Sequence, residues 1–76
     1  MNVVSIRTQT NGSLIRQIDH SSTYDLAKAA FHDMMKRSIS DENIVKVVCI
    51  LMDDEGAVHQ FDKWERTPAE PEQNQG

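Results

Sequence analysis

The sequence predicts a small α+β domain in which one amphipathic helix packs on an antiparallel sheet. Three observations support this prediction. A stretch with apolar residues at spacings of three and four lies near the middle of the chain, and a β-branched stretch with a turn signal lies on either side of it. The expected order is therefore β-β-α-β-β over residues 1–67. With 76 residues, of which 38% are hydrophobic, the chain has room for one core.

The first β-branched stretch is expected to form a hairpin. Apolar residues at 3–6 are followed by Asn11-Gly12, the pair typical of a type I′ turn, and by a second apolar stretch at 14–18. The apolar residues of that second stretch also fit one helical face with Ser13 as its cap. The alternative is therefore an N-terminal region that is helical or irregular, which leaves the order α-β-β.

The clearest predicted element is a helix over about residues 22–37. Its apolar stripe comprises Leu26, Ala27, Ala30, Phe31, Met34 and Met35. Hydroxyl residues at 21–23 offer an N-cap, and Asp33 and Arg37 are four apart in the order that favours an ion pair. Met35, near the edge of the stripe, is also a candidate contact for a partner.

The second hairpin is expected to begin with a strand over residues 44–52. This run is β-branched and apolar, and only Lys46 interrupts it. Such a run is typical of a strand that lies centrally in its sheet and is covered on most of both faces. The following Asp53-Asp54-Glu55-Gly56 predicts a tight turn with a G1 bulge and a positive φ at the glycine, and residues 57–61 would return as the partner strand.

Composition narrows the classes of function. Eight Lys and Arg against twelve Asp and Glu give a net charge of −4, which argues against a binder that works by neutralising phosphates. No apolar run approaches the ~20 residues that a membrane helix needs, and the N-terminus lacks the pattern of a signal peptide. The single cysteine, Cys49, fits a reducing compartment and the role of core filler. We therefore expect a cytoplasmic protein that does not contact membranes.

The excess of acidic residues is concentrated near the C-terminus. Residues 1–52 contain six basic and five acidic side chains (+1), and residues 53–76 contain two basic and seven acidic ones (−5). Complementary charge speeds docking onto a basic surface. The candidate partner-binding residues are therefore Asp53, Asp54, Glu55, Asp62, Trp64 and Glu65. Residues 68–76, which hold both prolines, are expected to form a disordered acidic and polar tail.

No catalytic, cofactor-binding or metal-binding residue is predicted. The acidic turn lacks the alternating ligands and the final glutamate of an EF-hand loop. The three histidines, His20, His32 and His59, lack the spacing of a metal motif. No glycine-rich phosphate loop or nucleophile elbow is present. We therefore do not expect an enzyme.

The expected function is that of a non-enzymatic module that binds a protein partner through its acidic second hairpin and Trp64. Small chains bury little apolar surface, and an open sheet edge could pair with a second copy, so a homodimer is also expected. The alternative is a nucleic-acid-associated regulator that uses basic residues of the first hairpin and helix, with Arg7, Arg16 and Lys46 as contacts. In its size, acidic balance and small α+β core, the chain is similar to accessory proteins and inhibitors that phages and mobile elements encode.

Overall fold

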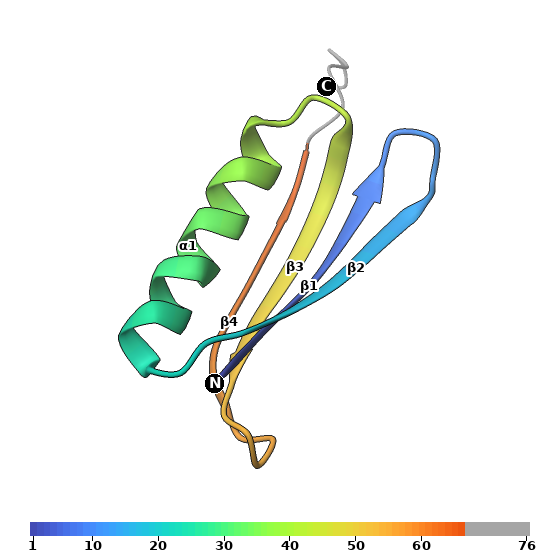
Figure 1. The fold of residues 1–76 in the computed structure, drawn as a ribbon. Helices are drawn as coiled ribbons and strands as arrows, with labels where there is room; N and C mark the ends of the chain where they lie inside the picture. The colour runs from blue at the N-terminus through green and yellow to red at the C-terminus, as the bar shows by residue number, and fades with distance from the viewer. Residues whose placement is uncertain (67–76) are drawn as a thin grey trace, which may run out of the picture.

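The computed structural model describes residues 1–66 and confirms the α+β architecture and the order β-β-α-β-β (Figure 1). The expected tail at 68–76 lies outside the described residues. The elements are β1 (Asn2–Gln9), β2 (Leu14–His20), α1 (Tyr24–Ser40), β3 (Ile44–Met52) and β4 (Val58–Glu65). The N-terminal region therefore forms the predicted hairpin rather than a helix. No helix in residues 1–66 is long and apolar enough to cross a membrane.

The four strands form one antiparallel sheet in the order β2-β1-β3-β4. The apolar strand β3 lies centrally, between β1 and β4, as its composition predicts. The edges are β2 and β4. Because α1 connects an edge strand to β3, it crosses one face of the sheet and packs on the two central strands (Figure 1).

Both hairpin loops have the same three-residue design. In the first loop, Gly12 donates its N–H to the Gln9 carbonyl at 2.9 Å, and in the second, Gly56 donates to the Asp53 carbonyl at 3.1 Å. The φ angles of the two glycines are 90° and 94°, in the left-handed region where a side chain is strained. This is a type I turn followed by a left-handed glycine, the geometry expected for the second loop.

The predicted type I′ turn at Asn11-Gly12 is wrong. That turn needs a positive φ at both residues, and no residue other than glycine has a positive φ in the described chain. Asn11 instead uses its side-chain oxygen to accept a hydrogen bond from the Ser13 N–H at 2.9 Å. This local hydrogen bond supports the longer loop.

The helix begins where the capping residues predict and ends later than expected. Thr23 is the N-cap, because its side chain accepts a hydrogen bond from the Leu26 N–H at 3.2 Å. The helix continues to Ser40 rather than to residue 37. Ser38 extends the buried stripe one turn beyond Met34, and Asp41 caps the C-terminus by donating its N–H to the Ser38 carbonyl. The packing of Ser38 against the core thus extends the helix through residues 38–40, whose side chains are typical of a loop.

The core lies between α1 and the adjacent sides of β1 and β3. Its buried members are Val3, Ala27, Phe31, Met34, Met35, Val47, Cys49 and Leu51. Leu26 was expected in this stripe but is 58% exposed. Met35 is buried, so its side chain belongs to the core and is no exposed contact for a partner.

Two expectations about the second hairpin are wrong. The strand β3 is not covered on both faces, because α1 packs only against Val47, Cys49 and Leu51 while Val48 and Ile50 remain partly exposed. The strand β4 extends to Glu65 rather than to residue 61, because it pairs along almost all of β3.

The Cys49 thiol is expected to react slowly in the folded protein. Cys49 is fully buried, and burial raises the pKa of its thiol to about 11, so little thiolate is present near pH 8. We expect a disulfide reagent such as Ellman's reagent to label it slowly in buffer and rapidly in denaturing urea. Equal rates under the two conditions would contradict this burial.

The two faces of the sheet are expected to differ in what they contribute to stability. Replacing the fully buried Leu51 with Ala should lower the free energy of unfolding by about 2–5 kcal/mol, since the substitution leaves a cavity. Replacing Ile18, which is 71% exposed, with Ala should change it by less than about 0.5 kcal/mol. Urea titrations of both variants check this difference, and similar losses would contradict it.

Candidate interaction surface

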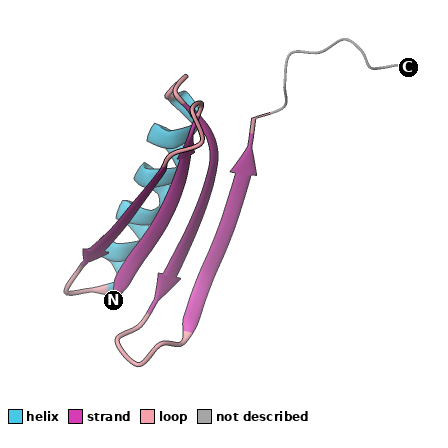
Figure 2. Cartoon of the chain, turned by 90° about the vertical axis from the view of Figure 1, so that its right-hand side faces the viewer, coloured by secondary structure: helices cyan, strands magenta, loops and turns pink. Residues whose placement is uncertain are grey.

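Within residues 1–66, no element covers the side of the sheet opposite α1, and we call this side the open face (Figure 2). Residues directly opposed in antiparallel pairs point to the same side of a sheet, so the register assigns each side chain to a face. Val3, which is buried beneath α1, opposes Leu51. Their neighbours Val4 and Ile50 oppose each other and therefore lie on the open face.

A continuous row of apolar side chains crosses the open face on all four strands. From β2 to β4 the row consists of Ile18, Val4, Ile50 and Phe61. Ile18 is 71% exposed and Phe61 55% exposed, and the two central residues are partly exposed. Single exposed apolar residues are common in proteins, whereas a contiguous apolar row on one face is a feature of interaction surfaces.

Positive charge borders this row. The next row along the strands consists of Arg16, Ile6, Val48 and Lys63, so a cation stands on each edge strand and two aliphatic residues stand between them. In the row beyond, Lys46 of β3 opposes Glu65 of β4. The open face thus carries three cations and one carboxylate, a net charge of 3 − 1 = +2, in a chain whose net charge is −4.

The acidic turn between β3 and β4 is engaged in contacts within the chain. Asp53 accepts hydrogen bonds from the Glu55 and Ala57 N–H groups, both at 2.9 Å, and its second oxygen lies 3.1 Å from His59 Nε2. The hydrogen bond from Ala57, followed by the one from His59, lowers the pKa of the Asp53 carboxyl. Asp53 therefore organises its own turn.

Asp54 is engaged in a similar way. Its carboxylate lies 3.0 Å from the amino group of Met1 and 3.6 Å from His20 Nε2. The hydrogen bond and charge of the Met1 amino group, with a smaller effect of His20, lower the pKa of the Asp54 carboxyl. Of the three carboxylates predicted at this turn, Glu55 alone forms no ion pair with the described residues.

The other predicted partner-binding residues lie further along β4. Asp62 and Trp64 oppose Cys49 and Val47, so they lie on the helix side of the sheet, whereas Glu65 lies on the open face. The Trp64 ring packs against the core, and the Arg66 guanidinium lies over it at 4.8 Å. The structure therefore groups the three carboxylates of the turn at one end of β4 and places Trp64 and Glu65 at the other end.

The exposed apolar residues of the open face were not among the predicted contacts. The sequence predicts a strand at Phe61 and, at Ile18, either a strand or one face of a helix. The available signal was the alternation along the second strand, which places Ile18 beside Arg16 on one face and Gln17 with Asp19 on the other. The helix α1 lies on the same side of the sheet as Gln17 and Asp19, so Ile18 and Arg16 lie on the side without a helix.

Acid is expected to destabilise the protein through the turn carboxylates. Lowered folded-state pKa values mean that the unfolded chain binds more protons, so these groups stabilise the fold above the unfolded pKa and lose that effect as the pH falls. The melting temperature of the parent chain should therefore fall more steeply between about pH 5 and pH 2 than that of the Asp53→Asn/Asp54→Asn variant. Glu55→Gln is the matched control and should follow the parent curve. Equal slopes for the parent and the double variant would contradict this role.

No group of three His, Cys, Asp or Glu side chains within residues 1–66 could hold a metal ion. The His59–Asp53 pair is exposed, and its aromatic neighbour Tyr24 lies 6.0 Å away between ring centroids. Comparison of the chain with protein-family models, with curated proteins and with solved structures found no match.

Proposed function

We propose that the protein is a non-enzymatic binding module whose open face receives an acidic, amphipathic segment of a partner protein. The observation that carries this proposal is the exposed row formed by Ile18, Val4, Ile50 and Phe61. Removing such apolar surface from water favours association by roughly 25 cal/mol for each Å² buried. A partner segment on this face would give the sheet a second covering layer, as in other domains with packed sheets.

The side chains of the row favour a protein over a nucleic acid. Single-stranded nucleic acids bind to sheets by stacking bases on aromatic side chains, and Phe61 is the single Phe, Tyr or Trp that the register places on the open face. The alternative regulator was expected to use Arg7, Arg16 and Lys46. Arg7 opposes Val47 on the helix side, so these three cations do not share a face.

The charge of the open face favours an acidic partner over a second copy of this chain. If two open faces met about an axis parallel to the strands, Arg16 of one copy would lie near Lys63 of the other, because they occupy the same row on opposite edges. Like charges at such a contact oppose association. Carboxylates that border an apolar stripe would instead meet Arg16, Lys46 and Lys63. Homodimerisation through an edge strand, β2 or β4, remains a separate prediction.

Selection from a random peptide library tests the proposal without knowledge of the partner. The immobilised protein should enrich peptides that combine Leu, Ile or Phe with Asp or Glu. Ile18→Ser and Phe61→Ser should each weaken binding of the enriched peptides about tenfold, as expected when an apolar contact of an interface is lost. Leu26→Ser is the matched control, because Leu26 is similarly exposed, at 58%, but lies on α1. Fluorescence anisotropy of labelled peptides gives the dissociation constants.

Three results would contradict the proposal. The first is enrichment of basic peptides, and the second is a loss of binding for Leu26→Ser as large as that for Phe61→Ser. The third is a mobility shift of single-stranded DNA or RNA that Arg16→Glu abolishes, since this would identify the open face as a nucleic-acid surface. Binding of the acidic peptides that strengthens as salt is lowered would support the charge argument.

A further inference from the structure

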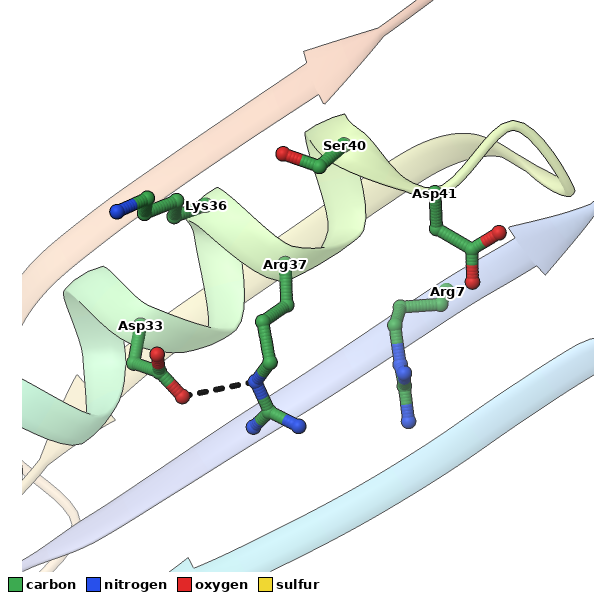
Figure 3. A pocket seen from close by; sticks show the side chains of 6 residues that line it. All are labelled: Arg7, Asp33, Lys36, Arg37, Ser40 and Asp41. Carbon is green, nitrogen blue, oxygen red and sulfur yellow. Dashed lines mark ion pairs between the residues drawn. The ribbon is translucent and has the colours of Figure 1, made fainter.

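A cavity of about 600 Å³ opens on the helix side of the sheet, between the C-terminal half of α1 and β1 (Figure 3). All six side chains that line it are polar or charged. They are Arg7, Asp33, Lys36, Arg37, Ser40 and Asp41. Three cations and two carboxylates give the lining a net charge of 3 − 2 = +1. The cavity is therefore separate from the open face and differs from it in chemistry.

Arg7 is the unusual member of this lining. It follows Val3 and Ser5 on the helix side of β1, and both of those residues are fully buried. One terminal nitrogen of Arg7 donates to the Gln17 side-chain oxygen at 2.9 Å, while its Nε is buried and donates to no described group. Arg7 forms no ion pair with the described residues. A partly buried guanidinium with one neutral acceptor lacks a counter-charge.

Arg37 brings a second guanidinium to the same cavity. Its Nε pairs with Asp33 Oδ2 at 2.8 Å, which fixes the side chain along the helix. Figure 3 shows its terminal nitrogens pointing in the same direction as the Arg7 guanidinium, while Lys36 points away from both. The Asp41 carboxylate accepts the Asn43 N–H at 2.9 Å, so it is used in the loop after α1. One terminal nitrogen of Arg7 and both terminal nitrogens of Arg37 donate to no group of the described residues and remain for a ligand.

We propose that this cavity binds a small oxyanion, a carboxylate or phosphate group, between the guanidinium groups of Arg7 and Arg37. Carboxylate and phosphate groups each carry two or more oxygens on one atom. The planar guanidinium of an arginine can donate two parallel hydrogen bonds to two such oxygens. The anion supplies the counter-charge that Arg7 lacks. Ser40 also lines the cavity, but its hydroxyl points to the side of Lys36, away from the two guanidinium groups (Figure 3).

NMR of the arginine side-chain Nε–H groups tests the proposal on the parent protein, without any substitution. Acetate, inorganic phosphate and chloride are titrated separately at constant ionic strength. We expect saturable shifts of the Arg7 and Arg37 signals with acetate or phosphate and no saturation with chloride. The anion with the lower dissociation constant identifies the carboxylate or the phosphate as the natural group.

Two variants separate this site from general attraction of anions to the surface. Arg37→Gln should weaken binding of the preferred anion about tenfold, because it removes one of two charged forks. The Arg37 side chain is 61% exposed, so its replacement leaves the core intact. Arg16→Gln is the matched control on the open face and should bind as the parent does. Shifts that do not saturate with either oxyanion, or equal weakening by the two variants, would overturn the proposal.

Discussion

The architecture depends on one constraint, which is that a single helix can cover only one face of a four-stranded sheet. Side chains alternate between the faces of a strand, so seating α1 on β1 and β3 buries Val47, Cys49 and Leu51 and leaves Val48 and Ile50 uncovered. The buried set is the core of the protein. The uncovered set is apolar as well, and this second apolar surface is the basis of the function that we propose.

The position of the helix also determines the chemistry of the helix side. Because α1 packs on the two central strands, it leaves the edge strand β2 without a covering layer. Two of the three β2 residues on this side, Gln17 and Asp19, are polar, and Gln17 joins Arg7 to Asp19 through its side-chain amide. Arg66 donates hydrogen bonds to the carbonyls of Ile39 and Asp41 and so contacts the C-terminal end of α1. The cavity lined by Arg7 and Arg37 lies between α1 and β1 on this side of the sheet.

The sequence predicts the order of elements well, because turn residues and hydrophobic period are local properties. The bounds of β3 and the glycine turn at Gly56 follow directly from such signals. The later end of the helix depends on Ser38 packing against the core, which is a tertiary contact. The acidic residues of the second turn were predicted to bind a partner because they are close together in the sequence. In the fold, Asp53 instead contacts His59 and Asp54 contacts the amino group of Met1. The open face could not be predicted from local sequence patterns, because it depends on which side of the sheet α1 covers.

The central claim is that the two faces of this sheet differ in their contact with solvent. Methyl NMR with a soluble paramagnetic agent measures it directly, because three pairs of adjacent residues place one methyl-bearing side chain on each face. These pairs are Val3 and Val4, Val47 and Val48, and Leu51 and Ile50. The account predicts strong broadening of Val4, Val48 and Ile50 and little broadening of their neighbours. Equal protection of both members of each pair in the dilute protein would contradict it.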